Sequence, residues 1–353
     1  MSARDSAGPR RRALLCGYYG EHNIGDDALL QVLLQQLPEG WQPLVTAHDR
    51  KQVGDRFRVE TVERRRLAAV LRALAGCDAL VLGGGSLLQD STSFRSLLYY
   101  GALILSARSR GKPVLLWGQG LGPLRRRRSR LIARLLLAQA RAISWRDPAS
   151  ARLAAGWGIT ASVGSDPVWS LPRGHWRGGE GPLLLCWRQV EQLEAGGWPP
   201  LLQALDVLAE RLDRPVHWLP FHREQDSGLL EHLQARGLVP ERLLRRSRSV
   251  AASDPEQAMA LFGGASLVLA MRLHGLVLAA LAGSPCVALS YDPKVAAAAQ
   301  ALGCPCHDLA LPPPPELVDQ WQLQLQRPPE PAALARLAQQ AQVHRDLLRR
   351  LDG

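Results

Sequence analysis

Lysine and aromatic residues are scarce in this chain of 353 residues. Only three of the 43 lysine and arginine residues are lysines, so Lys294, at a strand end, indicates a position that calls for a compact point charge, the alternative being an ordinary surface residue. Aromatic residues make up 5% of the chain, which leaves few stacking platforms for bases, and no nucleic-acid module is visible. The net charge of +11 therefore favours anionic substrates or lipid headgroups, and we expect no nucleic-acid partner.

The chain also lacks the cysteine pattern of a disulfide framework or of a metal site. Four of its six cysteines, Cys16, Cys77, Cys186 and Cys286, lie in apolar runs, as reduced core thiols do. The segment Cys304-Pro-Cys306-His307 would be half of a metal site, but the sequence holds no second half. We therefore expect a cytoplasmic protein with no metal and no cofactor.

No apolar run is both long and uninterrupted. Residues 273–293 are mostly apolar, but Gly283-Ser-Pro285 interrupts them, which favours a helix, a turn and a strand over a membrane span. The apolar segment at 13–19 is too short for a secretory signal. The arginine run at 125–128 is most simply a solvated face. Its alternative use is a peripheral contact with the inner face of a membrane or with a lipid diphosphate.

What the chain does contain is a regular alternation of strand-like and helix-like segments, which is typical of parallel α/β sheets. A hydrophobic content of 46% and a charged content of 21% are those of a globular protein. The expected segments include helices at 62–74 and 225–237, and strands at 78–82 and 113–117 that end in glycine-rich turns.

The alternation restarts after a stretch rich in glycine, arginine and tryptophan, which we interpret as a linker. This pattern predicts an α/β protein with two Rossmann-like domains facing across a cleft, a GT-B-like architecture. The expected parts are a disordered basic tail at 1–11, an N-terminal domain at 12–170, the linker at 171–181, a C-terminal domain at 182–311, and a proline-rich segment with a C-terminal helix at 312–353.

Three glycine-rich strand ends in the N-terminal half predict a wall that a bulky substrate approaches closely, because glycine lets the backbone turn tightly. Their candidate binding residues are Gly20, Asn23, Gly25, Asp26, Gly84, Gly85, Ser86 and Gln119. Asn23 and Asp26 have a simpler interpretation as caps of the helix that follows.

Cationic side chains follow several of the expected strands. Arg272 and His274 come after the buried run at 265–271, and Lys294 comes after the next strand. Arg146 and Arg188 end two further strands. Ligands of parallel sheets bind at the carboxyl ends of the strands, where helix N-termini also favour anions. These residues therefore predict a site for a small, highly charged anion.

Taken in order, these motifs resemble the polysaccharide pyruvyl transferases, and most closely their bacterial cell-surface-anchoring (CsaB) type. The matching residues are Gly17-Tyr-Tyr-Gly20, Asn23-Ile-Gly-Asp26, Leu82-Gly-Gly-Gly-Ser86, Gly118-Gln-Gly-Leu-Gly-Pro123, Arg146-Asp147, Ser165-Asp-Pro167, Arg272-Leu-His274 and Tyr291-Asp-Pro-Lys294. The resemblance covers roughly residues 12 to 305, and no single motif carries it.

The resemblance implies phosphoenolpyruvate as the donor substrate and, as the acceptor, a sugar of a cell-envelope glycan or of its lipid-linked precursor. It also implies that the N-terminal domain serves the acceptor and the C-terminal domain the donor. Donor-binding residues would be Arg146, Arg188, Arg272, Leu273, His274 and Lys294. We expect the catalytic residues to be Arg272, His274 as general acid, and Asp26 as the base on the acceptor side.

Two other functions remain open. A GT-B glycosyltransferase with a nucleotide-sugar donor would have the same fold. However, residues 275–291 hold no Asp or Glu to bind a ribose, and the sequence has no Asp-x-Asp motif. A non-catalytic polysaccharide-assembly protein is the second alternative, although it would not need the Arg, His and Lys set.

Overall fold

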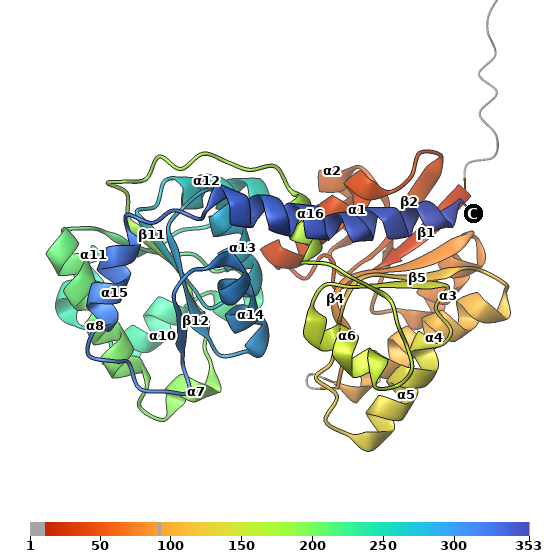
Figure 1. Ribbon diagram of the computed structural model, residues 1–353, viewed down its shortest axis with the longest axis horizontal. Helices are drawn as coiled ribbons and strands as arrows, with labels where there is room; N and C mark the ends of the chain where they lie inside the picture. The colour runs from red at the N-terminus through yellow and green to blue at the C-terminus, as the bar shows by residue number, and fades with distance from the viewer. Residues whose placement is uncertain (1–10, 91–92, 353) are drawn as a thin grey trace, which may run out of the picture. The chain divides into compact units, whose positions relative to one another are not determined.

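The computed structural model describes residues 11–90 and 93–352, which form two compact units (Figure 1). The second unit comprises residues 22–28 and 171–337, and the first comprises the rest of the described chain. The sequence had suggested 22–28 for the N-terminal domain and 338–353 for the C-terminal region, so two short pieces are grouped differently. The expected tail at 1–11 lies outside the described residues except for Arg11, which begins the first strand.

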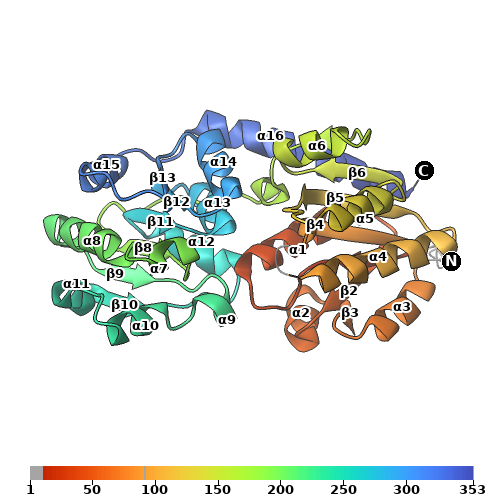
Figure 2. The ribbon, with the colours of Figure 1, turned by 90° about the horizontal axis from the view of Figure 1, so that it is seen from below.

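The first unit is built on a seven-stranded parallel sheet in the order β3-β2-β1-β4-β5-β6-β7. Its strands are β1 (Arg11–Cys16), β2 (Trp41–Ala47), β3 (Glu60–Glu63), β4 (Ala79–Leu88), β5 (Val114–Leu121), β6 (Ala142–Trp145) and β7 (Ser162–Val163). Its helices are α1 (Ile24–Gln36, of which residues up to 28 group with the second unit), α2 (Arg50–Phe57), α3 (Leu67–Ala75), α4 (Phe94–Ser109), α5 (Arg127–Leu137), α6 (Pro148–Ala155) and the later part of α16 (Pro331–Leu348). Helices α3, α4 and α5 pack side by side on one face of the sheet (Figure 2).

The second unit is built on a six-stranded parallel sheet in the order β10-β9-β8-β11-β12-β13. Its strands are β8 (Leu183–Cys186), β9 (Val216–Trp218), β10 (Ser247–Ser249), β11 (Leu267–Ala270), β12 (Cys286–Ser290) and β13 (Cys306–Asp308). Its helices are α7 (Glu191–Glu194), α8 (Trp198–Leu212), α9 (Arg223–Asp226), α10 (Leu229–Ala235), α11 (Glu241–Arg246), α12 (Pro255–Gly263), α13 (Leu273–Leu281), α14 (Pro293–Leu302) and α15 (Leu317–Gln324). Helices α12, α13 and α14 pack in a row, and α8 contacts α11 and α15.

The expected fold class, two Rossmann-like α/β domains, is confirmed. Each sheet reverses its strand order once, between β1 and β4 in the first unit and between β8 and β11 in the second. The carboxyl ends of the strands at such a switch point are where open parallel sheets bind ligands. No helix of the described chain is long and apolar enough to cross a membrane.

The expected helix at 62–74 is wrong in its first part. Residues 60–63 form the strand β3, and the helix α3 begins at Leu67. The preceding helix α2 was missed because it is mostly charged and buries only Val53, so it shows no apolar period. The expected helix at 225–237 is likewise two helices, separated by Gly228 with a φ of 75°.

The two glycine-rich strands are longer than expected. Strand β4 continues to Leu88 and β5 to Leu121, although Gly84, Gly85 and Gly118 all have positive φ. The register of this pair shifts at the glycines, and pairing resumes at Leu88 opposite Leu121. The glycines therefore form an irregularity within the sheet and do not end the strands.

Candidate functional site

The cations of the second unit lie around its switch point. Arg188 follows β8, and Arg272 follows β11 and occupies the N-cap of α13. Lys294 follows β12, in the first turn of α14, where its backbone N–H donates to Asp292 at 2.9 Å. The structure thus brings the predicted donor residues Arg188, Arg272, Leu273, His274 and Lys294 to one edge of one sheet.

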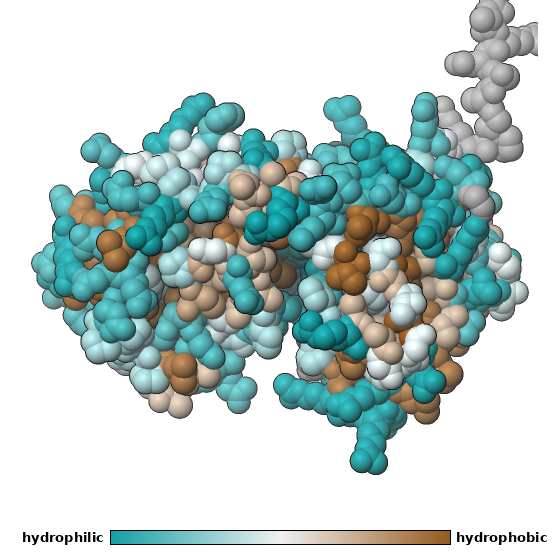
Figure 3. Space-filling model, viewed as in Figure 1, coloured by the Kyte–Doolittle hydropathy of each residue, from teal (hydrophilic) through white to brown (hydrophobic). Residues whose placement is uncertain are grey.

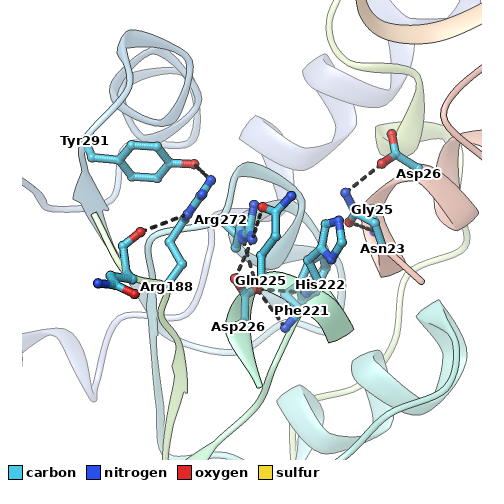
Figure 4. A network of polar contacts seen from close by, with 11 residues as sticks. Asn23, Gly25, Asp26, Arg188, Phe221, His222, Gln225, Asp226, Arg272 and Tyr291 are labelled. Atoms are coloured by element: carbon cyan, nitrogen blue, oxygen red, sulfur yellow. Dashed lines mark hydrogen bonds and ion pairs between the residues drawn. The ribbon is translucent and has the colours of Figure 1, made fainter. Parts of the chain in front are cut away.

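Arg272 is held by a carboxylate that sequence reasoning missed (Figure 4). Its Nε atom lies 3.0 Å from Oδ2 of Asp226, and its Nη2 group donates to Oδ1 of the same side chain. Nη2 also donates to Oε1 of Gln225 at 3.1 Å. The Nη1 group donates to no oxygen of the described residues. One end of the guanidinium is therefore fixed, and the other end keeps two donors for a ligand.

Asp226 is completely buried and also organises the loop after β9. Its Oδ2 atom accepts the backbone N–H groups of Phe221 at 3.1 Å and His222 at 2.8 Å. The same carboxylate thus accepts from Arg272 and from two backbone N–H groups at once. It therefore supplies a fixed negative charge behind Arg272.

His222 is a second residue that sequence reasoning missed. Its side chain is buried, and neither ring nitrogen has a hydrogen-bond partner among the described residues. Burial lowers the pKa of His222, and the positive charge of Arg272 lowers it further. The ring is therefore neutral near pH 7, with one N–H donor and one acceptor nitrogen at the candidate site. A Pro-Phe-His sequence in a loop gives no pattern that would have identified it.

The segment that precedes α1 joins this loop. The backbone N–H of Ile24 donates to the carbonyl of Phe221 at 3.1 Å, and Arg223 donates to His22 at 2.9 Å. Asn23 accepts the N–H of Gly25 at 3.0 Å and donates to Asp26 at 2.6 Å. Asn23 thus caps the helix, as its simpler interpretation predicted. Asn23, Gly25 and Asp26 nevertheless lie in the donor-side unit, not in the unit expected to hold the acceptor.

His274 packs directly against Gly25. A Cβ atom placed on Gly25 would lie 2.2 Å from Nδ1 of His274, which no real structure allows. Any side chain at position 25 would therefore displace the imidazole. Residues at 25 and 274, far apart in the sequence, thus fix one another in the second unit.

Arg188 connects two strand ends. Its Nη1 atom donates to the hydroxyl of Tyr291 at 3.2 Å, and its guanidinium lies 5.3 Å from the centre of that ring. Both contacts leave the cation at the same edge as Arg272 (Figure 4). Its charge contributes to the lowered pKa of His222.

In the first unit, Arg146 is buried and paired with Asp166 at 3.0 Å. Its Nη2 atom also donates to the hydroxyl of Ser86 at 3.3 Å. Gly120 makes room for both, because a Cβ there would lie 2.5 Å from Ser86 Oγ and 3.1 Å from Arg146 Nε. Arg146 is thus a fixed cation at the carboxyl ends of β4, β5 and β6.

Gln119, Gly84 and Gly20 have structural roles in the first unit. The amide nitrogen of buried Gln119 donates to the carbonyls of Leu82 at 3.0 Å and Gly84 at 3.4 Å, which leaves only Oε1 unpaired. Gly20 has a φ of 70°, and a Cβ there would lie 2.8 Å from the backbone of Asp49. Gly85 and Ser86 are partly exposed, whereas Gly20, Gly84 and Gln119 are buried.

The second unit therefore offers an anion site of unusual density: two arginines, a lysine, a buried neutral histidine and the N-terminus of α13. Such a set suits a ligand that carries more than one negative group on a small frame. Its arginines and lysine are hydrogen-bond donors, and its neutral histidine can donate or accept one.

Comparisons with known proteins concern the family and the fold. A family model described as polysaccharide pyruvyl transferase matches residues 23–293. No curated protein matches the sequence.

Among solved structures, UDP-GlcNAc 2-epimerase from Methanocaldococcus jannaschii is similar with a TM-score of 0.60 at 10% identity, over 91% of this chain and 94% of that one. UDP-GlcNAc 2-epimerase from Neisseria meningitidis is similar with a TM-score of 0.59 at 10% identity, over 96% and 99%. Anabaena HepE, in complex with UDP and glucose, is similar with a TM-score of 0.58 at 13% identity, over 97% of both chains. These proteins are GT-B enzymes, and at such identities the likeness concerns the fold alone.

Proposed function

Because the chain belongs to the polysaccharide pyruvyl transferase family, we propose that it moves the pyruvyl group of phosphoenolpyruvate onto two hydroxyls of a sugar. The acceptor is a cell-envelope polysaccharide or its lipid-linked precursor, as in the cell-surface-anchoring type of the family. The products are a cyclic pyruvate ketal and inorganic phosphate.

The observation that carries this proposal is the half-occupied guanidinium of Arg272. Asp226 and Gln225 take three of its N–H bonds, and the two on Nη1 remain for a ligand. Phosphoenolpyruvate has a carboxylate and a phosphate on three carbon atoms. Arg272 and Arg188 serve one anionic group each in this proposal, with Lys294 as a mobile third cation. The backbone N–H groups at the start of α13 add further donors.

The reaction requires a proton on C3 of the enol, attack of two hydroxyl oxygens on C2, and cleavage of the bond between C2 and the phosphate oxygen. The two hydroxyl protons balance this change, because one is equivalent to the proton gained by C3 and the other leaves with phosphate. We assign His274 the role of proton donor and Asp26 the role of base toward the acceptor. Gly25 keeps the imidazole of His274 in place.

For Arg146 in the first unit we retain the role that the family implies, a contact with phosphoenolpyruvate. The acceptor residues in this proposal are Gly20, Gly84, Gly85, Ser86 and Gln119 of the first unit, with Asn23 and Gly25 of the second. Gly85, Ser86 and Asn23 are partly exposed, and Asn23 caps a helix, so Gly85 and Ser86 are the first positions to substitute when an acceptor is known.

Calorimetric titration tests the donor directly. Phosphoenolpyruvate and a panel of nucleotide sugars are titrated into wild type, Arg272→Ala and Arg242→Ala. Arg242 is the matched control, because it also pairs with a buried aspartate, Asp206, at 2.7 Å. We expect phosphoenolpyruvate to bind wild type and Arg242→Ala. In Arg272→Ala the affinity should fall roughly ten- to hundredfold, since charged hydrogen bonds are lost.

Binding of a nucleotide sugar without binding of phosphoenolpyruvate would replace the proposal with a GT-B glycosyltransferase. An equal loss in both arginine variants would mean that the effect is one of folding. For catalysis, His274→Ala should slow acceptor-dependent phosphate release by about 10²- to 10⁴-fold. A variant that keeps most of the activity would remove His274 from the mechanism.

A further inference from the structure

Half of the exposed large hydrophobic side chains of the described residues lie on two neighbouring helices of the first unit. Leu98 and Leu105 of α4 are 49% and 54% exposed, and Leu131 and Leu135 of α5 are each 58% exposed. The other exposed large hydrophobic residues are scattered singly over the two units. Single exposed leucines are ordinary, whereas a group of four on adjacent helices indicates an interaction surface.

The four leucines form one stripe on each helix. Leu98 and Leu105 are seven residues apart and Leu131 and Leu135 four apart, so each pair lies on one side of its helix. The two helices are in close contact, since a Cβ placed on Gly101 of α4 would lie 3.2 Å from a methyl group of Leu136. The stripes are therefore parts of one surface. Figure 3 shows hydrophobic surface beside protruding hydrophilic side chains over α4 and α5.

Arginines surround these leucines, and no acidic residue accompanies them. Helices α4 and α5 contain no Asp or Glu. The exposed arginines are Arg95, Arg108, Arg125, Arg126, Arg127, Arg128, Arg130 and Arg134. None of them forms an ion pair with a carboxylate of the described residues, whereas Arg211, Arg236 and Arg245 elsewhere on the surface do. We name the four leucines and these eight arginines the arginine–leucine face.

The positive charges at the start of α5 do not stabilise the helix through its dipole. Arg126 is its N-cap and Arg127 and Arg128 form its first turn, where the helix dipole disfavours positive charge. Asp90 offsets part of this cost by accepting the backbone N–H groups of Arg125 and Arg126 at 2.8 and 3.0 Å. Its carboxylate thus binds the backbone and forms no ion pair with these arginines. Nε of Arg130 donates to the carbonyl of Leu124 at 2.9 Å, and the guanidinium of Arg128 lies 4.6 Å from the centre of the Phe94 ring.

The face adjoins the predicted acceptor residues. Helix α4 follows β4, which carries Gly84 to Ser86, and α5 follows β5, which carries Gln119. The N-terminal ends of both helices therefore lie at the carboxyl edge of the first sheet. An occupant of the face would present its polar groups at the edge where we place the sugar.

We propose that the arginine–leucine face docks on the surface of an anionic lipid bilayer, with the leucines in the interface and the arginines on lipid phosphates. The inference rests on the proposed function with a lipid-linked acceptor. The lipid of that acceptor would stay in the bilayer, and its sugar would reach the acceptor residues in water. A bilayer binds both the arginines, through lipid phosphates, and the leucines, through apolar burial. A nucleic acid would attract the arginines but would gain nothing from the exposed leucines.

Co-sedimentation with vesicles tests the docking. The vesicles are pure phosphatidylcholine, or phosphatidylcholine with three tenths phosphatidylglycerol, and no donor or acceptor is added. Wild type should bind the anionic vesicles and should not bind the neutral vesicles. Arg127→Gln/Arg128→Gln/Arg130→Gln should weaken binding at least about tenfold, because each arginine near such a surface contributes to it. Leu131→Ser/Leu135→Ser should weaken binding by at least about tenfold as well, through lost apolar burial.

The control is Leu323→Ser/Arg245→Gln, which changes an equally exposed leucine and an exposed arginine of the second unit. It should bind vesicles like wild type. Absence of vesicle binding, binding to neutral vesicles alone, or an equal effect of all variants would overturn the proposal. So would loss of binding in the arginine variant alone together with tight binding of duplex DNA. Phosphoenolpyruvate titrations on the same proteins keep a failure here distinct from a failure of the proposed chemistry.

Discussion

The guanidinium of Arg272 is bound side-on by the carboxylate of Asp226, with 3.0 Å between Nε and Oδ2 and a second contact from Nη2 to Oδ1. The same carboxylate accepts two backbone N–H groups from the loop after β9. One buried side chain therefore fixes both Arg272 and the loop that carries His222. Asp226 positions the guanidinium of Arg272, whose Nη1 group donates to no oxygen of the described residues.

This relationship predicts the effect of Asp226→Asn. An amide has one acceptor oxygen and one NH2 donor, so Arg272 loses a contact and its partly buried charge loses its counterion. We expect a loss of about 3 kcal/mol in the free energy of unfolding, as for other broken buried pairs. The affinity for phosphoenolpyruvate should fall roughly tenfold, because the free end of the guanidinium is no longer oriented. Urea unfolding and calorimetry measure the two effects.

Asp206→Asn is the matched control for this variant. Asp206 is also buried and also binds an arginine through Nε and Nη2, but it lies on α8. Its substitution should lower stability, by less because Arg242 is more exposed and also pairs with Glu210, and should leave phosphoenolpyruvate affinity unchanged. Equal losses of affinity in the two variants would show that Asp226 has no positioning role.

A second prediction concerns the contact between Gly25 and His274. In Gly25→Ala the added methyl group must displace the imidazole, because the available distance is 2.2 Å. Turnover should fall by about 10²-fold or more, as for the loss of a positioned proton donor. Gly179→Ala is the control, since nothing lies within 4 Å of a Cβ there. Phosphate release and circular dichroism should show lost activity in a folded protein, and full activity in Gly25→Ala would contradict the contact.

The sequence predicted which strand ends carry the cations, because strands and helices alternate clearly and ligands of parallel sheets bind at the carboxyl ends. It did not predict the partners of those cations. Asp226 and Arg272 are 46 residues apart in the sequence, and Gly25 and His274, which pack together, are farther apart still. Such contacts depend on which strands become neighbours, and no local sequence pattern indicates that β8 pairs with β11. Edge elements such as α2 and β3 were missed because they bury too little apolar surface to show a period.

A third prediction is a pH dependence of stability through His344. This residue of α16 is buried, lies 2.8 Å from the hydroxyl of Ser144 and 2.7 Å from the carbonyl of Ser165, and packs against Trp117. Burial lowers the pKa of His344, and this outweighs the effect of the Ser165 carbonyl. The unfolded chain therefore binds the proton more readily as the pH falls below about 6.5, so the folded state loses stability there.

The expected result is a lower melting temperature at pH 5.5 than at pH 7.5, with a smaller difference in His344→Gln. The slope due to one such proton is at most about 1.4 kcal/mol per pH unit. His232→Gln, at an exposed histidine of α10, should behave like wild type. If His344→Gln keeps the full pH dependence, other buried histidines account for it.

The last prediction separates stability from binding at His222. A buried imidazole without hydrogen bonds lowers the stability of the folded state. We therefore expect such a residue to have a functional contact, for example with a ligand. His222→Phe removes the two unpaired nitrogens and retains a ring of similar shape, so stability should stay equal or rise. Donor binding should weaken, by roughly tenfold for one lost hydrogen bond to a charged group.

His217→Phe provides the contrast, because Nε2 of His217 already accepts from Arg248 at 2.7 Å. Substitution there leaves Arg248 without its partner, so stability should fall while phosphoenolpyruvate affinity stays the same. Opposite shifts of the two measurements in the two variants would mark His222 as a ligand-binding residue, whereas a loss of stability without a change in affinity in His222→Phe would make it part of the core.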